Sequence, residues 1–138
     1  MGYNNVLVSV APFHLATYVS EIILKYPKVN FIVDFRDPWV GNKTSYGYYS
    51  LNENRKSIEK NSEKQVVERF NNVVTVSESI TTGLKNKYPN SKALFTTIPN
   101  GFDREDYLNL KLSKIKPSST KIRLVFSGTF YNSAEKYL

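Results

Sequence analysis

Two aspartates flank an arginine at the point where an apolar stretch of the sequence ends. Residues 29–33 have the pattern of a strand buried on both faces, and Asp34, Arg36 and Asp37 follow them directly. Paired carboxylates can bind a divalent ion or transfer a proton, and they can also pair with Arg36 to brace a loop. Trp39 follows, either as a core residue or as a stacking surface for a ring. Open α/β sheets bind ligands where their strands end, so the spacing favours a braced loop or a contact to a polar ligand.

His14 is the only histidine in the chain, and it falls just inside an expected helix that follows the first strand. A helix N-terminus attracts anions, so His14 could act there as a general base or as a phosphate contact. It could equally be an ordinary residue at the surface or at the edge of the core. A second candidate is the turn Ser127-Gly128-Thr129, whose backbone amides could approach a phosphate. Neither signal is specific, because the sequence has no Walker loop, complete GxGxxG fingerprint, HExxH or GxSxG motif.

Strands and helices alternate along the chain, and this alternation must position the candidate residues. We expect strands at 5–10, from 29, at 72–76, at 92–98 and at 122–126, and helices at 12–26, 51–70 and 77–88. Pro27 and Pro89 end two of these helices. Ser77 is a good N-cap, and Asp103 can cap one more short helix. Strands that alternate with helices predict an α/β fold with a mostly parallel sheet.

Two of the expected helices differ in how clearly they show an apolar face. The first has a stripe at helical spacing, formed by Leu15, Val19, Ile22 and Tyr26, with Ala16 and Ile23 beside it. The second has only a thin stripe, formed by Leu51, Ile58, Val66 and Phe70. Another face of the second helix carries Lys56, Lys60 and Lys64. That basic face is either an ordinary solvated surface or a contact to an anion or a membrane surface.

The composition restricts the classes of function. With 138 residues, of which 41% are apolar, the chain can bury one core. It has no cysteine, which excludes disulfides, thiol catalysis and cysteine-ligated metal. A formal net charge of +7 favours anionic partners, but no motif that reads nucleic acid accompanies the charge, so we expect no nucleic-acid partner. No apolar run is long enough to cross a bilayer and no signal peptide is visible, so we expect a cytoplasmic location.

Three parts of the chain carry a resemblance to a known family. They are Ser9-Val10-Ala11-Pro12-Phe13 with Asp34-Phe35-Arg36-Asp37-Pro38-Trp39, then Ile98-Pro99-Asn100-Gly101-Phe102-Asp103, and then Phe126-Ser127-Gly128-Thr129-Phe130-Tyr131. In order and spacing they resemble a bacterial GT-B glycosyltransferase of the family 4 type. The resemblance implies two Rossmann-like three-layer α/β/α domains that face each other across a cleft. It also implies transfer of a hexose from a nucleotide sugar to an acceptor, with retention at the anomeric carbon.

The resemblance gives each candidate residue a place. On the cleft face of the acceptor-side domain it puts His14, Asp34, Arg36 and Asp37, with His14 and Asp37 as the catalytic candidates. In the hinge it puts the substrate contacts Asn100 and Gly101, and near the donor diphosphate Gly128 and Thr129. The nucleotide sugar is then a substrate and not a cofactor, and no metal is expected. The acceptor would be a glycan or a lipid-linked sugar in cell-surface polysaccharide synthesis, in the cytoplasm or at the inner face of the plasma membrane.

The chain also departs from the family pattern. No Gly-rich loop precedes Tyr3, the Glu-x7-Glu motif of the second domain is missing, and Thr129 stands where many relatives carry Arg. We therefore expect a fragment that is inactive alone. Residues 1–110 would be a partial acceptor-side domain, 111–120 a linker, and 121–138 the first strand and turn of the donor-side domain.

Other functions stay open at this point. Missing donor motifs also fit a non-catalytic α/β binding or assembly module of glycosyltransferase-like fold. A basic domain that docks on anionic lipid or nucleic acid is a third alternative. The fragment hypothesis further predicts that the strand at 5–10 has an open apolar edge. Residues 121–127 could add to a sheet edge, within the chain or in a partner chain, and give a homodimer.

Overall fold

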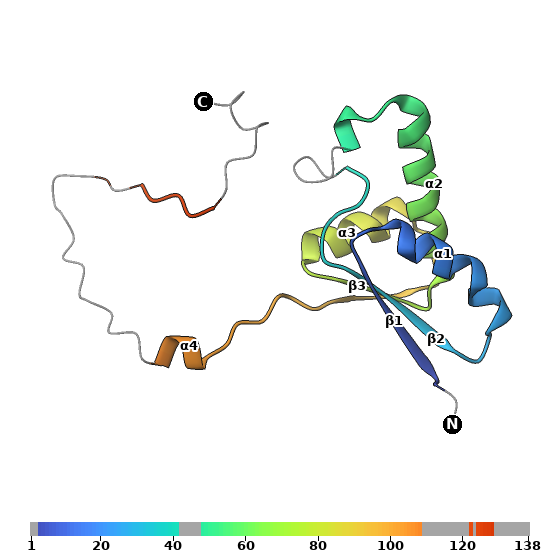
Figure 1. The fold of residues 1–138 in the computed structure, drawn as a ribbon, viewed down its shortest axis with the longest axis horizontal. Helices are drawn as coiled ribbons and strands as arrows, with labels where there is room; N and C mark the ends of the chain where they lie inside the picture. The colour runs from blue at the N-terminus through green and yellow to red at the C-terminus, as the bar shows by residue number, and fades with distance from the viewer. Residues whose placement is uncertain (1–2, 42–47, 109–121, 123, 129–138) are drawn as a thin grey trace. The chain divides into compact units, whose positions relative to one another are not determined.

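Figure 1 shows the fold in a computed structural model, which describes residues 3–41, 48–108, 122 and 124–128. The chain divides into two compact units, residues 1–100 and residues 101–138. Among the described residues, the first unit contains a sheet with its connecting helices, and the second contains one short helix. The linker predicted at 111–120 lies outside the described residues.

The first unit is built on a parallel sheet. Its strands are β1 (Asn5–Val10), β2 (Asn30–Phe35), β3 (Asn72–Thr75) and β4 (Leu94–Thr97), in the spatial order β1-β2-β3-β4. One row of the register passes from Val8 through Val33 and Val73 to Phe95. Side chains of this type fit the pleated, buried surface of a central sheet. The expected α/β class with a parallel, Rossmann-like sheet is confirmed.

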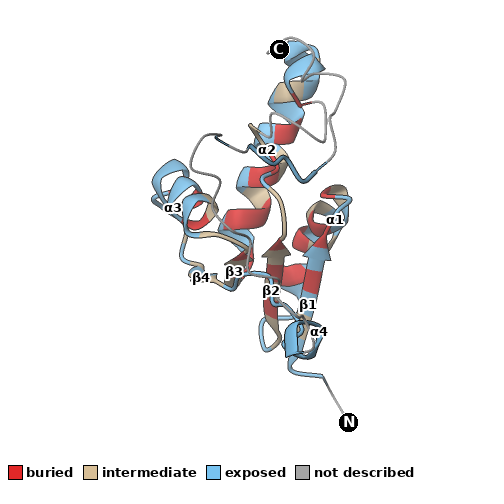
Figure 2. Ribbon diagram, turned by 90° about the vertical axis from the view of Figure 1, so that its left-hand side faces the viewer, coloured by how far each residue is buried: buried red, intermediate tan, exposed pale blue. Residues whose placement is uncertain are grey.

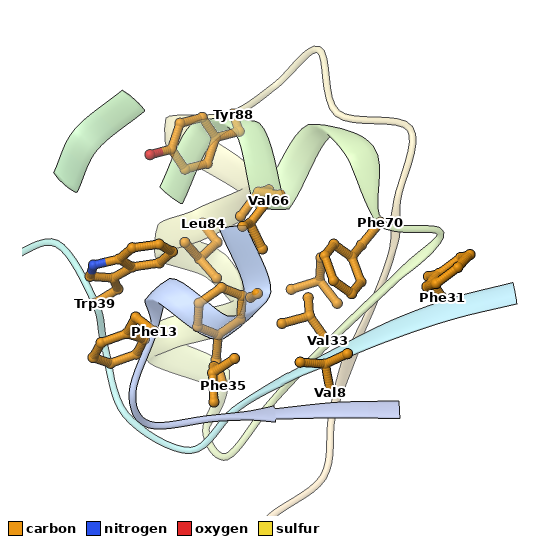
Figure 3. Close-up of a cluster of buried hydrophobic side chains, with 14 of the residues drawn as sticks. Val8, Phe13, Phe31, Val33, Phe35, Trp39, Val66, Phe70, Leu84 and Tyr88 are labelled. Carbon is orange, nitrogen blue, oxygen red and sulfur yellow. The ribbon is translucent and has the colours of Figure 1, made fainter. Parts of the chain in front are cut away.

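Three helices connect consecutive strands. They are α1 (His14–Ile22), which the 3-10 helix η1 (Ile23–Lys25) extends, α2 (Glu53–Arg69) and α3 (Glu78–Lys87). Each connection moves one strand further in the same direction across the sheet. Because parallel crossovers are right-handed, all three helices lie on one face. Their inward side chains form a single core with Val8, Val33 and Phe35 of the strands (Figure 3).

The other face of the sheet is uncovered in the described part of the chain. Along β2, Val33 is fully buried, whereas its neighbours Ile32 and Asp34 are only half-buried (Figure 2). Leu7 of β1 and Leu94 of β4 are each 65% exposed. The prediction that the second strand is buried on both faces is therefore wrong. Three layers were expected, with helices on both faces of the sheet. The described residues form two of them, the sheet and one layer of helices.

The inward face of α1 differs from the predicted one. Leu15 and Ile22 of the predicted stripe are exposed, and Ala16 and Ser20 are fully buried instead. Ser20 is satisfied in this position because its hydroxyl accepts a hydrogen bond from Gln65 Nε2 of α2 at 2.8 Å. The small side chains at these two positions let α2 approach α1 closely, which leaves no room for a larger apolar stripe there.

Side-chain caps fix where α2 and α3 begin. The Asn52 side chain accepts a hydrogen bond from the backbone N–H of Arg55 at 2.9 Å. The Ser77 hydroxyl accepts one from the backbone N–H of Ile80 at 3.5 Å, which confirms the predicted cap. Such caps satisfy donors that the first turn of a helix otherwise leaves unpaired.

The second unit contains the helix α4 (Glu105–Leu108). The Asp103 carboxylate accepts a hydrogen bond from the backbone N–H of Glu105 at 2.9 Å, so the predicted capping role of Asp103 is confirmed. Residues 122 and 124–128 are described without regular secondary structure, and their side chains are exposed. A strand requires a hydrogen-bonded neighbour. The strand expected at 122–126 therefore stays a prediction.

Candidate functional site

A pocket of about 460 Å³ lies just beyond the carboxyl end of β1. It is lined by Ala11, Pro12, Phe13, His14, Trp39, Tyr48, Leu51, Arg55 and Glu59. The turn after β1 and the start of α1 form one side, and the start of α2 forms another. We call it the His14 pocket. Its place at the ends of parallel strands is where open α/β sheets bind their ligands.

Three polar side chains of this pocket contact one another. Arg55 Nε donates to Glu59 Oε1 at 2.8 Å, and Arg55 Nη2 lies 2.8 Å from His14 Nε2. His14 Nε2 also lies 3.4 Å from Glu59 Oε1. One nitrogen cannot accept from Arg55 and donate to Glu59 at the same time. A guanidinium can only donate, and its contact is the shorter one, so the contact with Arg55 requires a lone pair on Nε2.

Glu59 is the centre of this arrangement. It is buried, and its second oxygen, Oε2, accepts a hydrogen bond from Trp39 Nε1 at 2.7 Å. Trp39 in turn stacks on Phe13 with ring centroids 5.1 Å apart, and the His14 ring meets it edge-on at 6.0 Å. Of the two roles considered for Trp39, the core role is the one observed (Figure 3). Its contacts hold Glu59 and His14 in fixed orientations.

Tyr48 supplies a polar atom that has no hydrogen-bond partner among the described residues. Tyr48 begins the 3-10 helix η2 (Tyr48–Ser50), is 7% exposed and lines the His14 pocket. Its hydroxyl oxygen is buried and makes no hydrogen bond within the described part of the chain. Leaving such a group unsatisfied costs about 1–3 kcal/mol, so we expect this hydroxyl to have a partner beyond the described residues.

The aspartate cluster predicted from the sequence lies elsewhere. The Asp34 carboxylate accepts a hydrogen bond from the Ser9 hydroxyl at 3.2 Å, and Arg36 Nη1 lies 3.5 Å from it. These contacts correspond to the bracing role considered for Asp34, since they join the ends of β1 and β2. Arg36 and Asp37 are half-buried, and neither residue lines the His14 pocket. Four residues were expected together on one cleft face, and among them only His14 lines this pocket.

The other predicted site residues, Asn100 with Gly101 and Gly128 with Thr129, come much later in the chain than the residues of the His14 pocket. Asn100 ends the first unit and Gly101 begins the second, and both are exposed. Gly128 is exposed, and a Cβ built on it would lie 3.0 Å from the Phe126 ring. Thr129 lies outside the described residues. The hinge and donor roles given to these residues stay predictions.

Sequence reasoning missed Arg55, Glu59 and Glu63. The predicted stripe of α2 ran through Ile58, which is exposed, whereas the buried line runs through Glu59, Glu63 and Val66. The glutamates stand at the i, i+4 spacing that continues this line toward the start of the helix. A second signal was the single tryptophan, whose indole N–H needs an acceptor when it is buried.

No family model matches the chain, and no curated protein matches it either. Within the described ranges, no helix has the length and apolar character needed to span a membrane. The same ranges contain no group of three or more histidine, cysteine, aspartate or glutamate side chains placed to hold a metal ion.

Proposed function

We propose that this chain is the acceptor-side α/β domain of a nucleotide-sugar-dependent glycosyltransferase, and that the His14 pocket binds a hydroxyl-bearing acceptor. The observation that carries the proposal is a pocket lined by the aromatic rings of Phe13 and Trp39 and by Tyr48, whose hydroxyl has no hydrogen-bond partner among the described residues. A sugar offers hydroxyls to such a group and an apolar ring face to aromatic walls. The resemblance of the three sequence stretches to the GT-B enzymes supplies the reaction class.

The contact between Arg55 and His14 Nε2 supports a role of His14 as general base. Its Nε2 lone pair takes a hydrogen bond from Arg55, and an acceptor hydroxyl would replace Arg55 there. The imidazole would take the hydroxyl proton as the oxygen bonds to the anomeric carbon on the same face from which the nucleoside diphosphate leaves, so that the configuration is retained. Glu59 Oε1, 3.4 Å from Nε2, would then stabilise the imidazolium. The role predicted for Asp37 is not needed for this step.

The proposal is tested by the fluorescence of Trp39, the only tryptophan of the chain and a wall of the pocket. The chain is titrated with methyl glucoside, glucose 1-phosphate and uridine diphosphate. We expect the sugar probes to change the emission saturably and uridine diphosphate to leave it unchanged. Emission that no sugar probe changes would contradict the proposal.

Tyr48→Phe gives the sharper comparison, because it removes only the hydroxyl. If the hydroxyl is hydrogen-bonded only when a sugar is bound, its removal raises the free energy of unfolding by about 1 kcal/mol and weakens sugar binding several-fold. Tyr49→Phe is the matched control, since Tyr49 is the next residue and is exposed. It should change neither quantity. A loss of stability in Tyr48→Phe with unchanged sugar binding would show that the hydroxyl has a partner within the protein.

A second candidate function is a non-catalytic assembly module. The observation that favours it is the uncovered sheet face, where Leu7 and Leu94 are each 65% exposed. These two side chains lie on the same face at opposite edges of the sheet, and exposed apolar side chains of this kind can mark an interaction site. The two functions make different predictions, because assembly depends on the sheet face and sugar binding depends on the His14 pocket.

A further inference from the structure

A second pocket, of about 350 Å³, lies between the residues that follow β2 and one face of α3. Its walls are mainly apolar, and they come from Phe35, Pro38, Val40, Ile80 and Leu84. Trp39 lines this pocket as well as the His14 pocket, so the indole stands between the two. We call this second pocket the Gly83 groove.

A glycine at the middle of α3 forms part of the wall of the groove. Gly83 lines the groove, and a Cβ built on it would meet nothing within 4 Å. Glycine inside a helix is about 1 kcal/mol less favourable than alanine. A Cβ would therefore fit without strain and would favour the helix, and a larger side chain at this position would extend into the groove.

The groove is elongated along the helix. Its α3 residues run from Ser79 to Lys87, which is a little over two helical turns. At a rise of about 1.5 Å per residue this is a length of ~12 Å. An apolar wall of that length fits an unbranched chain better than a compact ring.

One end of the groove carries an ion pair between the buried Glu63 and the partly exposed Lys87. Glu63 is 1% exposed and accepts hydrogen bonds from the Val40 backbone N–H at 2.7 Å and from the Tyr88 hydroxyl at 2.7 Å. It also accepts one from Lys87 Nζ. With three donors its carboxylate is well satisfied.

Lys87, unlike Glu63, still has hydrogen-bonding capacity for a ligand. An ammonium has three N–H donors, and Glu63 takes one of them. The Lys87 side chain is 38% exposed, so its other donors can meet a group at the mouth of the groove. Because the acid is satisfied and the ammonium is not, the charge that fits this end is negative. The formal net charge of +7 acts in the same direction over longer distances.

We propose that the Gly83 groove is a binding site for an anionic alkyl amphiphile. The alkyl chain lies along α3 over Gly83, between Val40 and Ile80, and the anionic head group receives hydrogen bonds from the Lys87 ammonium. This site is separate from the acceptor pocket and does not depend on the proposed sugar transfer.

The test is titration of the full chain with octanoate, with octyl phosphate and with 1-octanol as the uncharged probe. Trp39 emission reports binding, and the shift of the Gly83 amide resonance in a nitrogen-correlated NMR spectrum reports its place. We expect both anions to bind at least tenfold more tightly than octanol. Equal affinity for octanoate and octanol would overturn the proposal.

Two substitutions separate the chain-binding part from the head-binding part. Gly83→Leu should weaken octanoate binding at least tenfold while the melting temperature stays equal or rises. Lys87→Met keeps an apolar stem and should reduce the affinity for octanoate to that for octanol. The matched control is Lys85→Met on the same helix, because Lys85 does not line the groove. Unchanged octanoate affinity in Gly83→Leu would overturn the site.

Tyr48→Phe distinguishes the two pockets, since Tyr48 lines only the His14 pocket. Octanoate affinity that is unchanged in this variant supports a separate groove. Octanoate affinity that falls in Tyr48→Phe and not in Gly83→Leu would place the amphiphile in the His14 pocket and overturn the inference.

Discussion

Glu63 is a buried acid that joins three parts of the first unit. Its carboxylate binds the backbone after β2 through Val40, and it binds α3 through Lys87 and Tyr88. A buried acid is costly alone, but loss of one member of a satisfied network costs more than its formation contributes. Glu63 therefore fixes how α2, α3 and the segment after β2 pack against one another.

We expect Glu63→Gln to lower the free energy of unfolding by about 2 kcal/mol, because the amide nitrogen must face a donor and Lys87 loses its counter-charge. Urea denaturation followed by circular dichroism measures this. Glu68→Gln on the same helix is the control, since Glu68 is exposed and lies 3.9 Å from Lys64. It should change stability by no more than about 0.5 kcal/mol. Equal losses in the two variants would contradict the role of Glu63.

Burial raises the pKa of Tyr88 far above its usual range, and its hydrogen bond to Glu63 adds to the effect. The folded state therefore holds the proton more tightly than the unfolded state. The stability from this group is fully present below the ordinary tyrosine pKa of about 10, and it is lost as the pH rises beyond that value.

This sign gives an alkaline prediction. Above pH ~10 the wild-type chain should lose about 1.4 kcal/mol of unfolding free energy per pH unit from Tyr88 alone. Tyr88→Phe should remove that part of the slope, and Tyr18→Phe, at an exposed position, should not. Unfolding free energies from urea melts between neutral and alkaline pH measure the slopes. Parallel slopes in wild type and Tyr88→Phe would show that Tyr88 titrates normally.

At the scale of the elements, α1 meets α2 through small side chains. Ala16 is fully buried, and Leu15 beside it is 48% exposed. We expect Ala16→Leu to cost about 1–3 kcal/mol of unfolding free energy, because the added volume forces the two helices apart. Leu15→Ala should cost less than about 1 kcal/mol. Thermal and urea unfolding measure the loss of stability in each variant. A larger loss in Leu15→Ala than in Ala16→Leu would show that Leu15 faces inward, as the sequence predicted.

The ends of the elements could be predicted from the sequence because local chemistry sets them. Ser77 caps α3 and Asp103 caps α4 through short-range hydrogen bonds, and prolines stop the helices before β2 and after α3. The inward faces could not be predicted in the same way. Whether Ala16 or Leu15 turns inward depends on α2, which the pattern of α1 alone does not contain.

In the candidate site, too, the residue set by local sequence could be predicted and the residues set by tertiary contacts could not. His14 could be placed at the start of a helix near the strand ends from its neighbours in sequence. Arg55 and Glu59 could not, because they reach His14 from a helix about forty residues later, and charged residues on a polar helix ordinarily face solvent. Arg55 is exposed and is held there by its ion pair with Glu59, and the burial of Glu59 follows from its hydrogen bond with Trp39.

At the scale of the whole molecule, the edge and the face of the sheet that no other described residues cover lie together. β1 is an edge strand, as predicted for residues 5–10, and Leu7 on it faces the uncovered side. Free backbone groups and exposed apolar side chains on one strand favour association with another copy. We propose that the chain forms a homodimer through this part of the sheet.

Analytical ultracentrifugation over a range of concentrations tests the dimer. Leu7→Lys should shift the chain toward monomer, because charge on an edge strand opposes pairing. The control is Tyr18→Lys, which also removes a large exposed apolar side chain but lies on α1. A wild-type chain that sediments as a monomer at every concentration would exclude this dimer.

The order of the strands has a consequence for synthesis of the chain. Because β1, β2, β3 and β4 lie in the sheet in the order in which they leave the ribosome, each new strand finds its first neighbour already made. Among the four described strands, none has to insert between two that are already paired. The sheet can therefore grow at one edge during translation, with each βαβ unit completed before the next strand emerges.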